Sequence, residues 1–137
     1  MGVATDLGRP TASVRAALRG CHVLVLEANH DEAMLWNGPY PWSVKQRIAS
    51  SHGHLSNRAA ADLARELHHP TLSSIILAHL STHCNTGDMA RKVIERVLDR
   101  ISYNGAVTVA PQNKPMDTID VMAMRRKNQA YEQMSLL

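Results

Sequence analysis

The sequence predicts an α/β domain with a largely parallel sheet, and three observations support this fold class. Short apolar runs of strand length alternate with amphipathic stretches whose apolar residues recur every three or four positions. The first strand, helix and second strand follow one another closely, an order that favours parallel pairing and a right-handed crossover. Histidines and carboxylates stand where several of these strands end, which is where open parallel sheets gather ligands.

The chain opens with the first strand–helix–strand unit. Gly2 to Thr5 is expected to form a short strand, with Asp6 at its carboxyl end. Pro10 to Arg19 follows as an amphipathic helix, and Gly20 stops it. His22 to Leu26 is the next strand, because its apolar run is continuous and of strand length.

A proline-rich turn interrupts the helical pattern that follows. Asp31 to Trp36 is expected to make one or two helical turns, and Asn37 to Pro41 breaks them because this segment holds a glycine and two prolines. Trp42 to Ala49 resumes as a short helix. Tyr40 and Trp42 are expected to pack against this turn and anchor it, with lining of a substrate cleft as the alternative.

The centre of the chain holds two copies of a His-Leu-Ser triplet, beginning at His54 and at His79. Ser56 is a good N-cap for a helix from Asn57 to Leu67, so His54 lies in the loop just before a helix. Ser74 to Ala78 has the length and β-branched content of a buried strand, so His79 lies at a strand's carboxyl end. Both imidazoles are therefore expected where secondary structure changes.

The remaining elements close the sheet. Thr86 caps the clearest helical pattern in the chain, which runs from Gly87 to about Ile101. Ala106 to Ala110 and Thr118 to Met122 are expected to form two closing strands, separated by a proline-containing turn. The residues after Ala123 are polar, with weak helical character.

Composition is typical of one globular domain. The chain has 137 residues, of which 45% are apolar and 20% charged. No membrane partner and no membrane-spanning helix are expected, because no apolar run approaches the ~20 residues that a membrane span needs. The start lacks the features of a secretory signal and two cysteines are too few for a disulfide framework, so the expected location is the cytoplasm.

The net charge of +3 is only a weak indication of a nucleic-acid partner. Arg125, Arg126 and Lys127 lie together in the C-terminal tail, and the chain without that tail is close to neutral. A solvated chain end is the preferred explanation of this basic cluster, and contact with phosphate is the alternative.

Four positions at strand ends or helix entries form the candidate site: Asp6, the cluster from Glu27 to Asp31, His54 and His79. Carboxylate and imidazole on one rim make the ligand chemistry of zinc or a similar first-row metal. Ordinary polar loop residues also occupy strand ends, so the residues alone leave both interpretations open. Glycine motifs for phosphate or dinucleotide binding are absent from the sequence.

Several motifs resemble the metallo-β-lactamase fold. Gly2 to Gly8 resembles the strand and turn that bear its bridging metal aspartate, and Ile76 to Ser81 resembles its last metal-histidine strand. Gly53 to Asn57, followed by an alanine-rich helix, resembles the segment that ribonuclease Z-like phosphodiesterases place before that histidine. Leu24 to Asp31 and Gly38 to Trp42 are similar to a narrower bacterial branch of metal-dependent exonucleases and general metallohydrolases.

The resemblance implies that residues 1–123 form the C-terminal half of a metallo-β-lactamase-type αββα sandwich, followed by a polar basic tail at 124–137. The family builds most of its two-metal site from an upstream His-x-His-x-Asp-His motif, which this sequence lacks. A truncated or split reading frame, or a late start codon, is therefore expected. Half a sandwich leaves one sheet face uncovered, so the missing N-terminal half or a second copy of the chain is the expected partner.

The resemblance also implies roles for the site residues. Asp6 would bridge two metals and His79 would ligate one of them, with zinc as the expected divalent metal and manganese as the alternative. An activated water would attack phosphorus, so a nucleic acid or another phosphodiester is the expected substrate. His54 would contact the scissile phosphate or protonate the leaving oxygen, and Glu27 would orient it.

His30 and Asp31 are candidates for the same rim, with a helix cap at these positions as an equal alternative. The expected activity is that of a metal-dependent hydrolase, specifically a nuclease-like phosphodiesterase. Because one fold serves many substrates, hydrolysis of an ester, thioester or lactam is the alternative activity. An inactive remnant or an interaction module is the alternative outside enzymes.

Overall fold

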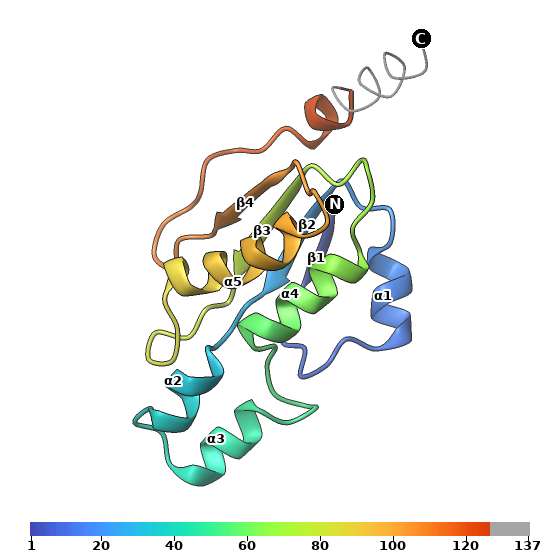
Figure 1. Ribbon diagram of the computed structural model, residues 1–137. Coiled ribbons are helices and arrows are strands. Elements are labelled where there is room, and N and C mark those ends of the chain that lie inside the picture. Colours follow the sequence, from blue (N-terminus) through green and yellow to red (C-terminus); the bar gives the residue numbers. More distant parts are fainter. Residues whose placement is uncertain (127–137) are drawn as a thin grey trace.

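A computed structural model describes residues 1–126 and contains a four-stranded sheet whose strands are all parallel (Figure 1). The strands follow one another in space as they do in sequence, in the order β1-β2-β3-β4. The α/β class and the parallel pairing predicted from the sequence are confirmed. The strands are β1 Gly2–Ala4, β2 Val23–Glu27, β3 Ser74–Ala78 and β4 Ala106–Val109.

Two helices begin directly after the caps that the sequence predicted for them, Ser56 and Thr86, whereas the first helix begins at Ala12 rather than at Pro10. The side chains of Thr11, Ser56 and Thr86 each accept a hydrogen bond from the backbone N–H three residues ahead. Asp31 caps a further helix in the same way. The helices are α1 Ala12–Leu18, α2 Glu32–Asn37, α3 Trp42–Ile48, α4 Asn57–Glu66 and α5 Gly87–Asp99.

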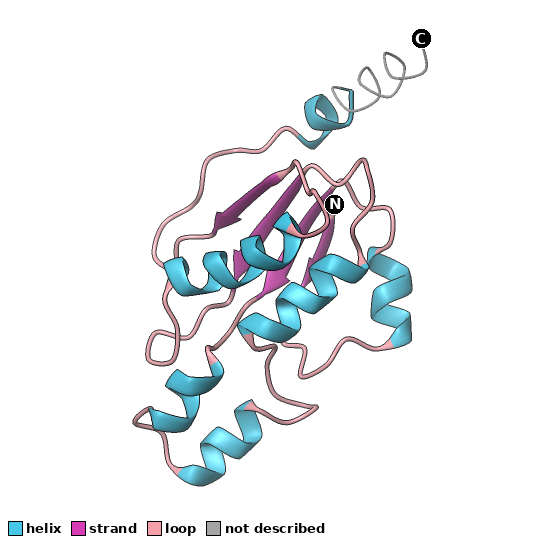
Figure 2. Cartoon of the chain, in the orientation of Figure 1, coloured by secondary structure: helices cyan, strands magenta, loops and turns pink. Residues whose placement is uncertain are grey.

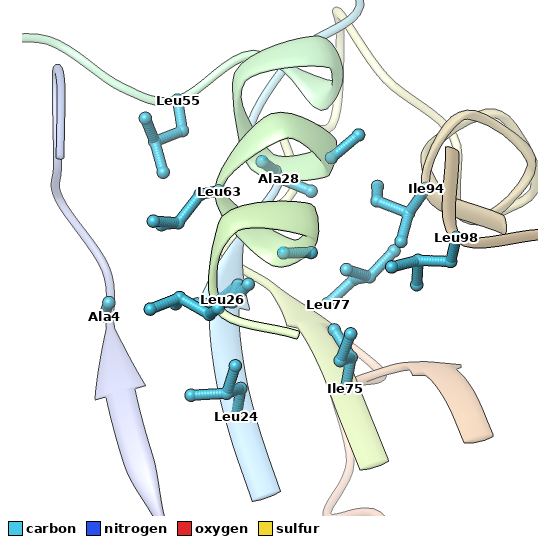
Figure 3. Close-up of a cluster of buried hydrophobic side chains, with 14 of the residues drawn as sticks. Ala4, Leu24, Leu26, Ala28, Leu55, Leu63, Ile75, Leu77, Ile94 and Leu98 are labelled. Atoms are coloured by element: carbon cyan, nitrogen blue, oxygen red, sulfur yellow. The ribbon is translucent and has the colours of Figure 1, made fainter. Parts of the chain in front are cut away.

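One face of the sheet packs against α4 and α5, which lie side by side over the strands (Figure 2). The contact is made by fully buried side chains, each of which stabilises the fold by about 1.5–3 kcal/mol. This core holds β2 and β3 rigidly beneath the strand ends that carry the site. Its central members are Leu24, Leu26, Leu63, Ile75, Leu77, Ile94 and Leu98 (Figure 3).

The opposite face of the sheet carries the alternate residues of each strand. Val3, Val25, Ile76 and Thr108 lie in register across the four strands. Ile76 is 5% exposed, whereas Val3 on the edge strand is 58% exposed. An apolar part of this face therefore reaches solvent along β1.

The prediction of a second closing strand at Thr118–Met122 is wrong. Thr118 to Asp120 lie outside the sheet, and a helical turn begins at Val121. The Asp120 side chain accepts a hydrogen bond from the N–H of Ala123 at 2.8 Å, as a helix cap does. The helix-capping preference of Asp120 is satisfied locally, whereas the β-branched residues of this segment have no neighbouring strand to pair with. The segment therefore starts a helical turn instead of a strand.

The carboxyl ends of β1, β2 and β3 point toward α2 and α3, which project beyond the sheet (Figure 1). Residues 32–48 are called the α2–α3 lobe below. Within residues 1–126, no helix is both long enough and apolar enough to span a membrane. The predicted basic tail falls mainly on residues 127–137, which lie outside the described part of the chain.

Candidate metal centre

Four side chains from separate segments converge at the carboxyl ends of the strands. Asp6 follows β1, Glu27 ends β2, His79 follows β3, and His54 lies in the loop before α4. One ligand atom from each of the four lies within 4.8 Å of the others. The structure thus brings together the four residues to which the sequence analysis assigned ligand or catalytic roles.

Glu27 lies at the centre of this cluster and is fully buried. Its Oε1 oxygen lies 2.7 Å from Nδ1 of His54 and 2.7 Å from Nδ1 of His79. Its Oε2 oxygen accepts hydrogen bonds from the backbone N–H of Leu7 at 2.9 Å and of Leu55 at 3.2 Å. One buried carboxylate therefore fixes the three segments that carry the rest of the cluster.

The contacts of Glu27 leave one nitrogen free on each ring. Because a carboxylate oxygen only accepts hydrogen bonds, each ring presents its Nδ1–H to Glu27, and Nε2 carries the lone pair of the neutral imidazole. Nε2 of His79 lies 3.8 Å from Oδ1 of Asp6. Zinc binds such atoms at about 2.0–2.2 Å, so one cation fits between them. The chemistry of these donors therefore suits a divalent metal.

His54 lies beside this pair of donors. Its ring centre is 5.1 Å from that of His79, and its Nδ1 is 3.8 Å from Oδ1 of Asp6. The side chain is 28% exposed, so the ring is reachable from solvent although it is held from behind by Glu27. Its Nε2 is consequently the nitrogen that a substrate can contact.

Asp6 and His79 share an unusual backbone conformation. Their φ angles are 58° and 57°, in the left-handed region that residues other than glycine rarely adopt. Asn29 holds one of these strained positions, because its Nδ2 donates a hydrogen bond to the carbonyl of His79 at 2.9 Å. Such strain costs about 1–3 kcal/mol per residue and clusters at functional sites. No pattern in the sequence signalled it.

Two glycines allow the loops of the site to approach other backbone segments. A Cβ atom on Gly8 would lie 2.2 Å from the carbonyl carbon of Ser51, and one on Gly53 would lie 2.1 Å from the carbonyl oxygen of Ile48. Side chains at these two positions would force the backbones apart. The turn after β1 therefore packs on the loop before α4, and that loop packs on the end of α3.

A buried pair of asparagines near the site was not identified from the sequence. Nδ2 of Asn57 donates to Oδ1 of Asn85 at 2.9 Å, and Nδ2 of Asn85 donates back to Oδ1 of Asn57 at 2.8 Å. Asn85 also donates to the carbonyl of Ala28 at 2.8 Å. The pair joins the start of α4, the end of β2 and the loop after β3. An asparagine directly after the N-cap of an otherwise apolar helix face was the available signal.

His30 and Asp31, the two further candidates for the rim, are not among the four residues of the cluster. Asp31 accepts a hydrogen bond from the N–H of Met34 at 2.9 Å and caps α2, which was the alternative left open. His30 is 3% exposed, and its Nδ1 is buried without a hydrogen-bond partner among the described residues. Burial lowers the pKa of His30 from its ordinary value, against an opposing effect of the nearby Glu32.

Comparison with known proteins identifies nuclease relatives. Exodeoxyribonuclease YycJ of Bacillus anthracis is 36% identical over 103 residues, which are 75% of this chain and 39% of the relative. Exodeoxyribonuclease WalJ of Streptococcus pneumoniae, in strains D39 and R6, is 38% identical over 115 residues, which are 83% of this chain and 42% of the relative. No protein-family model matches the chain.

The chain therefore spans about two-fifths of the length of the curated relatives it matches. The resemblance drawn from its motifs is confirmed, since the relatives bear the name of the exonuclease branch. The four-stranded parallel sheet with its helices is compatible with the same fold. The chain is a homologue of the YycJ and WalJ exodeoxyribonucleases, which are metallo-β-lactamase-fold proteins.

Proposed function

We propose that this chain supplies the C-terminal half of a metal-dependent nuclease that hydrolyses phosphodiester bonds in DNA. The observation that carries the proposal is the convergence of Asp6, Glu27, His54 and His79 within 4.8 Å at one edge of the sheet. The names of the relatives, exodeoxyribonucleases YycJ and WalJ, support DNA as the substrate.

Asp6 and His79 are the residues that would hold a divalent metal, with zinc as our first choice and manganese as the second. The metal would supply a Lewis acid and a bound water whose pKa is lowered toward ~7. Asp6 is 68% exposed on its side chain, so its second carboxylate oxygen is open to another cation. A catalytic zinc normally keeps about three protein ligands, so the remaining donors would come from the N-terminal half.

His54 is proposed as the residue that acts on the substrate. Glu27 accepts its Nδ1–H at 2.7 Å, which fixes the plane of the ring and leaves Nε2 for the substrate. In its doubly protonated form, with a proton taken up from solvent at Nε2, the ring would donate that proton to the leaving oxygen as the P–O bond breaks. This arrangement leaves His79 to bind metal and His54 to serve the substrate, although both rings share the same carboxylate oxygen.

A basic groove near the site provides a second argument for nucleic acid. The groove has a volume of about 460 Å³ and lies between α4 and α5. Glu32, which lines it, accepts a hydrogen bond from the hydroxyl of Ser56 at 3.0 Å, two residues after His54. Four guanidinium groups outnumber two carboxylates along its walls, which suits a phosphate backbone. Its charged residues are Glu32, Asp62, Arg58, Arg65, Arg96 and Arg100.

The proposal is tested by completing the domain. The genomic DNA for several hundred bases before the Met1 codon is read in all frames, and any segment that encodes His-x-His-x-Asp-His is co-expressed with this chain. We call that combination the completed domain. Metal-dependent cleavage of a labelled oligonucleotide by the completed domain, but not by the chain alone, is the expected result.

An inactive remnant is the competing function, because residues 1–126 would contribute only Asp6 and His79 as direct metal donors. It would be supported if no upstream segment carried the histidine motif and the purified chain neither bound zinc nor cleaved DNA. A completed domain that binds metal but leaves single-stranded and duplex DNA intact would also contradict the nuclease proposal.

A further inference from the structure

The two tryptophans of the chain form an exposed pair on the α2–α3 lobe. Trp36 and Trp42 are 42% and 65% exposed, and their ring centres lie 5.3 Å apart with a tilt of 40°. Trp42 was expected to pack against the proline-rich turn as an anchor, and this expectation is wrong because the side chain is mostly exposed. Burying exposed aromatic surface lowers the free energy, so a partner that covers these two rings would bind favourably.

The lobe is attached firmly to the candidate metal centre. The N–H of His54 donates to the carbonyl of Ile48, the last residue of α3, at 2.9 Å. The N–H of Asp31, which caps α2, donates to the carbonyl of Cys84, in the loop after β3, at 2.9 Å. Both helices of the lobe are thus tied to a loop of the site, and Figure 1 shows them beyond the carboxyl ends of the strands. A ligand on the tryptophans would therefore lie at the same end of the sheet as the site, beyond the carboxyl ends of the strands.

The charge beside the aromatic pair favours an anionic partner. Nζ of Lys45 donates a hydrogen bond to the carbonyl of Trp36 at 2.8 Å, which places an ammonium group next to the pair. Residues 42–48 contain no acidic side chain that would offset this charge. Aromatic rings flanked by cations form the usual surface for single-stranded nucleic acid, because bases stack on the rings while cations neutralise phosphates.

We propose that Trp36 and Trp42 form a stacking platform that holds unpaired bases of a single DNA strand beside the candidate metal centre. Duplex DNA would bind the platform less well, since its bases already stack on one another. This inference rests on the proposed function, and it adds that the substrate is presented as a single strand. Lys45 would neutralise a phosphate next to the platform.

Intrinsic fluorescence gives a direct test, because both tryptophans of the chain belong to the pair. The purified chain is titrated, with metal chelated, against a thymidine oligonucleotide of about 12 nucleotides, within the usual range of site sizes. We expect quenching of the tryptophan emission. An oligonucleotide of equal length made of abasic sites keeps the phosphates but offers nothing to stack, so it should quench little.

Variants separate stacking from charge. Trp42→Ala should weaken binding of the labelled oligonucleotide by about 5- to 150-fold, the range found when a stacking residue is removed. Trp42→Phe keeps an aromatic face and should lose much less. Met89→Ala, which removes an exposed apolar side chain from α5, is the matched control and should bind as the parent does. Circular dichroism confirms that each variant is folded.

Three outcomes would overturn the inference. The first is equal binding of the abasic and thymidine oligonucleotides, and the second is unchanged binding by Trp42→Ala. The third is tighter binding of RNA or duplex DNA than of single-stranded DNA. Conversion of an oligomer to a monomer by Trp42→Ala, with DNA binding unchanged, would assign the pair to contact between copies. All of these tests work without metal, so they remain separate from any failure of hydrolysis.

Discussion

The Oε1 oxygen of Glu27 lies 2.7 Å from Nδ1 of His79, and the same oxygen serves His54. Glu27→Gln would leave one acceptor oxygen and introduce an N–H₂ donor, which cannot satisfy four hydrogen-bond donors. We expect the metal affinity of the completed domain to fall about 10- to 100-fold. The free energy of unfolding should fall as well, because an unsatisfied buried group costs about 1–3 kcal/mol.

Zinc titration by calorimetry and urea unfolding measure these two effects of Glu27→Gln. Glu95→Gln is the control, since that carboxylate lies on α5 and is 44% exposed. Equal zinc affinity in the parent and in Glu27→Gln would show that the carboxylate does not position a metal ligand.

Asp6→Ala and His79→Ala should each remove at least one metal equivalent from the completed domain. Both side chains contribute a donor atom at the point where a cation fits, 3.8 Å apart. Elemental analysis of the purified variants measures the metal content. His52→Ala, in the exposed loop before α4, should retain the full metal content. Unchanged metal in both site variants would refute the assignment.

His54→Ala should retain metal and lose turnover. The ring is bound through Nδ1 to Glu27 and presents only Nε2 outward, so its removal takes away a proton donor rather than a direct ligand. Turnover should fall by a factor of about 10² to 10⁴, the scale of a lost general acid. Metal analysis and a labelled-oligonucleotide assay on the same preparation decide the case. Joint loss of metal and activity would make His54 a ligand instead.

The stability of the chain should decrease as the pH falls below about 6.5, and His30 should account for part of this change. Burial lowers the pKa of His30 in the folded state, so between the lowered value and the unfolded value the unfolded chain binds more protons. Its contribution is present above the unfolded pKa and is lost as the pH falls through that window. His30→Gln should therefore show a shallower loss.

Urea unfolding at about pH 7.5 and about pH 5.5, on either side of the ordinary histidine pKa, measures the effect of His30→Gln. His52→Gln is the control, because that side chain is exposed. The same pH dependence in the parent and in His30→Gln would show that the buried ring does not resist protonation.

The 137-residue chain alone should self-associate and show no nuclease activity. Val3 is 58% exposed on the sheet face opposite α4 and α5, and burying it against a second copy is favourable. Light scattering on the purified chain measures its mass, and Val3→Asp should shift the mass toward a monomer. Met89→Asp is the matched control. A monomeric parent chain that cleaves DNA with added metal would contradict this expectation.

The sequence was sufficient to predict most elements because their signals are local. Thr11, Ser56 and Thr86 cap helices within three residues of themselves, and the run Ser74–Ala78 is buried as a strand with the predicted bounds. The strand at Thr118–Met122 failed because strand formation depends on a neighbour. The cap at Asp120 requires no partner from elsewhere in the chain.

The sequence was also sufficient to predict which residues form the site, but it did not predict all the contacts between them. Asp6, His54 and His79 stand at ends of elements, which a sequence pattern can locate. Glu27 was expected to orient His54 alone, although its carboxylate also contacts His79, which lies 52 positions further along the chain. Such a contact depends on how β2 and β3 pair in register, which residue identity does not reveal.

At Asp6 and His79 the left-handed backbone is strained, while the side chain at each position supplies a donor atom to the site. Glycine adopts a φ near 58° without strain, so replacing Asp6 by glycine would relax the backbone while discarding a donor atom. At His79 the same relief would be opposed by loss of the contact with the buried Glu27. A directed-evolution experiment that selects only for heat resistance would therefore accept glycine at position 6 before position 79. Homologues that keep aspartate and histidine at these two positions would therefore have been selected for the chemistry of the site rather than for stability.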